Sequence, residues 1–305
     1  MIINYALEHN IVLKVNEKGE FGNYPLLSAT YNNSVEMVKL LVNYAKKHHI
    51  ILKVNEKGEF GNYPDYPLLL AACTDEIDIA TYGNGYDMVK LLFNYAKDTN
   101  ISITCNEIDR YGKCPLTYAA ANDNIEMFKL IMDYASKNEN NIILRINEKD
   151  EFGNYPIFYP IINHNKEILE ILINYANKHN IKLELNEQNG DGDYSLLLAT
   201  YVNGYDMVKL LFNYAKDNNI SLNLNQTNVQ GNYLLLYATR RNNVEMVKLI
   251  MDYANETNVI LKLIEKKNKD GNCPLSFAYI NYNNEMMEIY FLTMPMKKIC
   301  IFKAK

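Results

Sequence analysis

Residues 14–52 read KVNEKGEFGNYPLLSATYNNSVEMVKLLVNYAKKHHIIL, and most of the remaining chain repeats this stretch. The glycine of its Gly-Asn-Tyr-Pro motif recurs at Gly22, Gly61, Gly112, Gly153, Gly192, Gly231 and Gly271. Subtracting these positions gives intervals of 39, 51, 41, 39, 39 and 40 residues. A period of 20–50 residues indicates a stacked repeat protein, whose units bury their apolar faces against their neighbours.

Composition fits one continuous repeat array. The chain has 305 residues, of which 48% are hydrophobic, and a net charge of −5. This charge argues against a nucleic-acid partner, which usually meets a basic face. The five cysteines follow no metal-ligand spacing and favour a reducing, cytoplasmic location. Neither a signal peptide nor an apolar run of 18 residues is found, so we expect no membrane partner.

Each repeat predicts a tight turn followed by two helices. Turn-forming residues surround each motif glycine, and Pro25 suits the first position of a short helix. That helix should end at Asn32-Asn33. A capping box from Asn33 to Glu36 predicts the start of a second helix. Its apolar face should carry Met37, Leu40, Leu41 and Tyr44.

Apolar residues occupy every second position of the segment that follows the second helix. Ile50, Leu52 and Val54 show this pattern first, and it recurs in later repeats, for example at Ile181, Leu183 and Leu185. Alternation with period two predicts a strand with one buried face.

The complete unit resembles the ankyrin repeat. Tyr24-Pro25-Leu26-Leu27 stand where that family has Thr-Pro-Leu-His, and the run from Glu36 to Leu41 matches its Glu-Val-Val-Lys-Leu-Leu. The resemblance implies a mainly α fold, an ankyrin-type α-solenoid of stacked strand/turn–helix–turn–helix repeats with extended hairpins. The family's threonine and histidine are replaced here, so we expect their hydrogen bonds to give way to apolar packing.

The glycine spacing predicts a single array over residues 1–305. Its units are 1–13 (partial), 14–52, 53–103 (with an insertion), 104–144, 145–183, 184–222, 223–262 and 263–305 (degenerate). The chain begins inside a second helix. The insertion around 72–80 is either a loop or a longer first helix. Pro160 should distort the first helix of its repeat.

Sequence motifs for chemistry are not found. The chain has no phosphate-binding glycine loop, no His-Glu-x-x-His and no Gly-x-Ser-x-Gly. We therefore expect no enzyme activity, catalytic residue, cofactor, metal site or small-molecule ligand.

The ankyrin resemblance implies a protein-binding scaffold that uses turn tips and first helices on a concave face. A structural or regulatory segment of a longer protein, or a secreted effector acting in a host cell, stays open. Aromatic residues are favoured interface anchors. The candidate contacts are four tip residues, Phe21, Phe60, Tyr111 and Phe152, and four first-helix residues, Tyr118, Tyr159, Tyr201 and Arg240. Packing of these rings inside the fold is the alternative.

Overall fold

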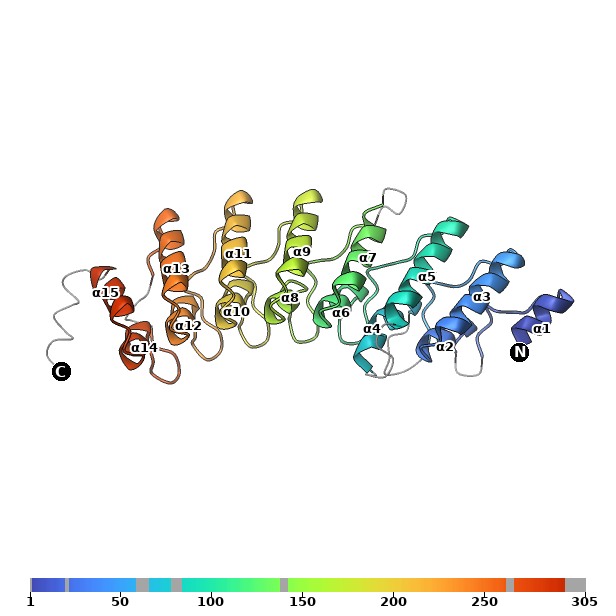
Figure 1. The fold of residues 1–305 in the computed structure, drawn as a ribbon, viewed down its shortest axis with the longest axis horizontal. Helices are drawn as coiled ribbons and strands as arrows, with labels where there is room; N and C mark the ends of the chain where they lie inside the picture. Colours follow the sequence, from blue (N-terminus) through green and yellow to red (C-terminus); the bar gives the residue numbers. More distant parts are fainter. Residues whose placement is uncertain are drawn as a thin grey trace. The chain divides into compact units, whose positions relative to one another are not determined.

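The structure is a computed structural model, and it describes residues 2–19, 22–58, 66–77, 84–137, 142–261 and 266–293. The chain forms two compact units, Met1–Glu151 and Phe152–Lys305. The described residues form 15 helices and no strand, so the mainly helical repeat fold is confirmed (Figure 1).

Short first helices and longer second helices alternate along both units. The first helices are α2 (Pro25–Tyr31), α4 (Pro67–Ile77), α6 (Pro115–Ala121), α8 (Phe158–Ile162), α10 (Ser195–Tyr201), α12 (Leu234–Arg240) and α14 (Pro274–Ile280). The second helices are α1 (Ile2–His9), α3 (Val35–Lys47), α5 (Asn84–Thr99), α7 (Ile125–Ala135), α9 (Lys166–Lys178), α11 (Tyr205–Asp217), α13 (Val244–Glu256) and α15 (Asn284–Thr293).

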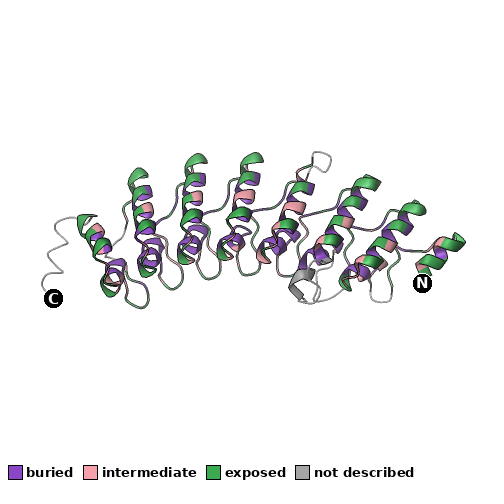
Figure 2. Ribbon diagram, in the orientation of Figure 1, coloured by how far each residue is buried: buried purple, intermediate pink, exposed green. Residues whose placement is uncertain are grey.

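Within each unit, first helices pack against first helices and most second helices pack against second helices of the next repeat. The first helices α2, α4 and α6 contact one another in order, as do α8, α10, α12 and α14. The second helices α1, α3, α5 and α7 also contact one another in order, as do α9, α11 and α13, and each first helix contacts its own second helix. Buried residues lie along these contacts, and exposed residues lie along the outer side of the second helices (Figure 2).

The second helices begin one residue later than the capping boxes predict. Asn33 has a left-handed φ of 51°, and Ser34 is the N-cap, with its side chain accepting a bond from the Met37 amide. The same shift recurs at Asn242, where φ is 56° and Asn243 is the cap. Asparagine tolerates this backbone region, so it occupies the position where the ankyrin family has glycine.

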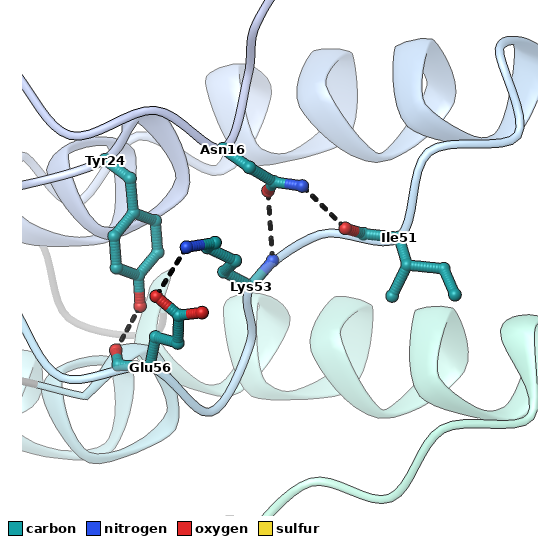
Figure 3. A network of polar contacts seen from close by, with 5 residues as sticks. All are labelled: Asn16, Tyr24, Ile51, Lys53 and Glu56. Carbon is teal, nitrogen blue, oxygen red and sulfur yellow. Dashed lines mark hydrogen bonds and ion pairs between the residues drawn. The ribbon is translucent and has the colours of Figure 1, made fainter.

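The predicted strands are absent from the described residues, although their alternating burial is present. Leu52 and Val54 are buried, and Ile51 is exposed. Asparagine side chains, rather than a neighbouring strand, bind this backbone. Asn16 donates to the Ile51 carbonyl at 2.7 Å and accepts from the Lys53 amide at 3.1 Å (Figure 3). Asn55, Asn106 and Asn186 make the same pair of bonds to the next repeat.

The tyrosine that replaces the family's threonine forms hydrogen bonds, contrary to the expectation of purely apolar packing. Tyr24 is fully buried, and its hydroxyl donates to the Glu56 carbonyl of the following repeat (Figure 3). Tyr233 donates in the same way to the Lys266 carbonyl at 2.9 Å. The ring therefore fills the core while the hydroxyl links successive repeats.

Two first helices depart from the common length of seven residues. α4 has 11 residues, so part of the insertion extends this helix; residues 78–83 lie outside the described residues. α8 has five residues and begins at Phe158, two residues later than the repeat predicts. Pro160 thereby falls in the first helical turn, where a missing N–H removes no helical bond. The proline shortens α8 instead of breaking its interior.

Candidate protein-binding surface

Asparagine or aspartate side chains shape the turn tips. In the tip around Gly231, Asn228 Oδ1 accepts bonds from the amides of Gln230 and Asn232 at 3.1 and 3.0 Å. These side-chain bonds add to a regular backbone turn, in which the Gly231 amide donates to the Asn228 carbonyl at 2.9 Å. Asp109, Asn189 and Asn268 cap their tips in the same way.

Backbone hydrogen bonds join neighbouring tips within the second unit. The carbonyl of the residue before the motif glycine accepts an amide from the next tip: Phe152 from Gly190 at 2.9 Å, Asp191 from Val229 at 2.9 Å, and Gln230 from Lys269 at 3.0 Å. These residues therefore follow one another in a row. In the first unit, Tyr111 accepts the Glu151 amide at 2.8 Å.

The predicted aromatic tips have different environments. Phe21 and Phe60 lie outside the described residues. Tyr111 is half-buried, and the Arg110 guanidinium lies 4.4 Å from the centre of its ring. Phe152 is 62% exposed. Of the four predicted rings, Phe152 therefore offers a partner the largest described area.

The predicted first-helix tyrosines divide by their position along the helix. Tyr118 is buried, and its hydroxyl donates to Asp109 Oδ2 at 2.5 Å, so it supports the tip from inside. We therefore leave Tyr118 out of the proposed surface. Tyr159, at the equivalent position of α8, is half-buried. Tyr201 and Arg240 are exposed, and each is the last residue of its first helix.

That last position forms an exposed row in the second unit. Its members are the final residues of α8, α10, α12 and α14, which pack side by side: Ile162, Tyr201, Arg240 and Ile280. We call them the end-of-helix row. Ile162, Tyr201 and Ile280 are 46%, 45% and 57% exposed. The sequence prediction missed Ile162 and Ile280, although both share the repeat position of Tyr201.

Aromatic and cationic contacts fix the centre of the row. The rings of Tyr201 and Tyr237 lie 5.1 Å apart. The Arg241 guanidinium lies 5.1 Å from the centre of the Tyr201 ring, and its Nε donates to the Tyr201 carbonyl at 3.0 Å. Arg240 has no ion-pair partner among the described carboxylates. Arg240 therefore presents an unpaired positive charge in the same row as the Tyr201 ring.

The described residues were also compared with the requirements of ionisable sites, metal sites and membrane spans. Burial raises the pKa of the Asp193 carboxyl, which accepts a bond from Asn228 Nδ2 at 2.9 Å. Within the described ranges, histidine, cysteine and acidic side chains form no group of three that could hold a metal ion. Among the helices described, none is long and apolar enough to span a membrane.

Helix pairs that stack through buried faces, and glycine turns joined by backbone bonds, define a helical repeat protein. No family model matches the sequence, and no curated protein matches it. Among solved structures, the chain is similar to the ankyrin repeat domain of Bcl-3, described as a unique member of the IkappaB protein family. The TM-score is 0.57 at 18% sequence identity, and the match covers 89% of this chain and 99% of that domain. The fold is thus that of an ankyrin repeat domain.

Proposed function

We propose that this protein is a non-enzymatic scaffold that binds a protein partner through turn tips and the ends of first helices. The end-of-helix row carries the proposal, because three large apolar side chains and an unpaired arginine follow one another there in an exposed position. Aromatic residues and arginine are the side chains most enriched among energetically dominant interface contacts. Tyr111 and Phe152 extend the proposed contact to the tips.

The proposal also includes an intracellular location. Cys73, Cys105, Cys114 and Cys273 are buried free thiols, and none of the four is in a disulfide. Unpaired buried cysteines are typical of proteins that work under reducing conditions. Neither a nucleic acid nor a small molecule is part of the proposed function.

The test is affinity capture from native lysate with three forms of the full chain. The row variant carries Ile162→Ser, Tyr201→Ser, Arg240→Ser and Ile280→Ser. The control variant changes exposed residues that share one position on the outer side of second helices: Asn174→Ser, Asn213→Ser and Asp252→Ser. Exposed substitutions usually change stability by about 0.5 kcal/mol or less each, so both variants should fold.

We expect a partner that the wild type and the control retain and the row variant loses. Circular dichroism verifies that the row variant keeps its helix content. A folded row variant that retains every partner would refute the proposed surface.

A further inference from the structure

The segments that end the first helices of the second unit carry positive charge, although the chain as a whole has a net charge of −5. The last residue of each first helix and the four residues after it form the segments 162–166, 201–205, 240–244 and 280–284. These segments contain Lys166, Arg240 and Arg241 but no aspartate or glutamate. The positive charge therefore lies on and beside the end-of-helix row.

The tips at the opposite ends of these first helices carry more negative than positive charge. Residues 189–193, 228–232 and 268–272 contain Asp191, Asp193 and Asp270 and one cation, Lys269. Charged groups across an interface are arranged so that opposite charges meet. An acidic group of a partner should therefore approach the ends of the first helices and not the tips.

Arg240 and Arg241 are the two cations of these segments that lack a described carboxylate partner. Lys166 pairs with Glu170 at 3.4 Å. Both arginines are exposed, and neither forms an ion pair with a carboxylate of the described residues. The two guanidinium groups are therefore available to an anion of a partner.

The repeat does not require arginine at these two positions. In the other first helices of the unit, the equivalent pairs are Ile162-Asn163, Tyr201-Val202 and Ile280-Asn281. A cation is favourable near the end of a helix, but α8, α10 and α14 end without one at either position. Stability of the repeat thus does not explain the arginine pair, whereas recognition of an anion does.

Apolar groups flank the arginine pair on both sides. α12 packs between α10 and α14, so Tyr201 and Ile280 lie on the two helices next to Arg240. The Nε of Arg241 is bonded to the Tyr201 carbonyl. A guanidinium has five N–H donors, so its terminal N–H groups are left for another acceptor. The row therefore presents an aromatic ring, two cations and an aliphatic side chain in that order.

We propose that the partner segment at the end-of-helix row is an extended acidic peptide. One of its carboxylates accepts hydrogen bonds from Arg240 and Arg241, and an apolar side chain on each side of this carboxylate covers Tyr201 and Ile280. Hydrogen bonds between guanidinium and carboxylate groups are short and about twice as strong as those between neutral groups. The inference rests on the proposed function and adds the chemistry of the partner.

The spacing of the first helices sets the spacing of the peptide contacts. Packed helices lie about 8–10 Å apart, and an extended chain rises about 3.3 Å per residue. Contacts to successive helices therefore recur at every third residue. The expected motif has an aspartate or glutamate with a large apolar residue three positions before it and another three positions after it. The phosphates of a nucleic acid would meet the arginines but would leave Ile280 without an apolar contact, so a peptide fits better.

The test begins with a phage library of random twelve-residue peptides, selected against the immobilised full chain. Parallel selections use the row variant, Arg240→Glu and Lys209→Glu. Lys209 is exposed on α11, so Lys209→Glu makes the same change in net charge away from the row. Circular dichroism verifies that each variant keeps its helix content.

We expect the wild type and Lys209→Glu to enrich the acidic motif, and the row variant and Arg240→Glu to lose it. The most enriched peptide is then labelled with fluorescein and titrated by fluorescence anisotropy. Arg240→Glu should weaken its binding by about tenfold or more, and Lys209→Glu should change it little. Added salt should weaken binding, because it screens exposed charges. A single-stranded oligothymidylate of twelve nucleotides should not compete with the peptide.

Three results would overturn the proposal. They are selection of neutral or basic peptides by the row, absence of any peptide that the row variant loses, and equal competition by the oligothymidylate. The first result would leave the proposed function standing with a different partner chemistry. The proposed function fails separately, when a folded row variant retains every partner captured from lysate.

Discussion

The Tyr95 hydroxyl accepts a hydrogen bond from the Leu52 amide at 2.9 Å and donates one to the Ile50 carbonyl at 3.0 Å. Tyr95 lies on the second helix of one repeat, and Leu52 lies in the extended segment that precedes the same repeat. Tyr214 makes the same two bonds to Leu183 and Ile181, at 3.2 and 3.1 Å. One phenol thus satisfies backbone groups that a strand partner would otherwise bind.

Tyr95→Phe should destabilise the first unit while preserving its packing. The ring remains, but the buried Leu52 amide loses its acceptor, which costs about 1–3 kcal/mol. Thermal unfolding and hydrogen exchange measure the effect, and the Leu52 amide should show the largest gain in exchange rate. Tyr205→Phe is the control, because Tyr205 is 37% exposed and its hydroxyl makes no hydrogen bond among the described residues. Equal effects of the two variants would contradict the assigned role.

Two motif glycines, Gly231 and Gly271, allow the cost of backbone strain to be measured apart from the cost of close packing. Gly231 and Gly271 have left-handed φ values of 77° and 79°. A Cβ at Gly231 would lie 3.0 Å from Asn268 Cα, whereas a Cβ at Gly271 would meet nothing within 4 Å. The two positions therefore share the conformational constraint and differ in crowding.

Gly271→Ala should cost about 1–2 kcal/mol, the strain of a left-handed residue that has a Cβ. Gly231→Ala should cost more, because the added methyl also pushes the next tip away from the backbone bond between Gln230 and Lys269. Denaturant unfolding of both variants tests the order. If Gly271→Ala were the more damaging, close packing of tips would not explain the glycine at Gly231.

The sequence predicted the repeat and the helices but not how the extended segments are held. Alternation at Leu52 and Val54 reports which side chains are buried, and this part of the prediction is correct. Alternation does not identify the group that binds the backbone. Here Asn16 and Tyr95 side chains take that role, so the segment forms no strand although its burial pattern is strand-like.

The candidate surface was predicted only in part, because sequence periodicity does not show which helix positions the neighbouring repeats cover. Tyr118 and Tyr201 are both first-helix tyrosines, but they occupy the fourth and seventh helical positions. Positions three residues apart lie near the same side of a helix, so periodicity alone did not separate them. The neighbouring repeats cover the fourth position and leave the seventh exposed, which depends on packing between repeats.

Cysteine labelling tests the burial of the core. Burial raises the pKa of the Cys105 thiol to about 12, and burial also raises the pKa of Cys114. Because the thiolate is the reactive form, both should resist alkylation at pH 8 in the folded protein. Iodoacetamide treatment followed by peptide mapping should find both modified only in denaturant. Rapid modification of either one under native conditions would contradict the described core.

The last prediction concerns the carboxylate at the second-unit tips. Asp193 accepts a bond from Asn228 Nδ2 at 2.9 Å, and at the next tip Asn232 Oδ1 accepts one from Asn268 Nδ2 at 3.0 Å. Asp193→Asn therefore keeps an acceptor that the fold already uses at this position. It removes a charge whose burial raises the pKa of the Asp193 carboxyl above its ordinary value.

Asp193→Asn should raise the free energy of unfolding near pH 7 by about 0.5 kcal/mol, a small gain because solvent screens a half-buried group. A raised folded pKa means that the wild type loses stability as the pH rises from the unfolded value through the folded one. The variant and the wild type should therefore have the same free energy of unfolding near pH 3. The difference between them should appear as the pH rises above 3 and should stay constant at neutral pH. Unfolding measured across this range tests the sign, with exposed Asp252→Asn as the control. A difference that instead grows toward low pH would show that the ionised Asp193 stabilises the fold.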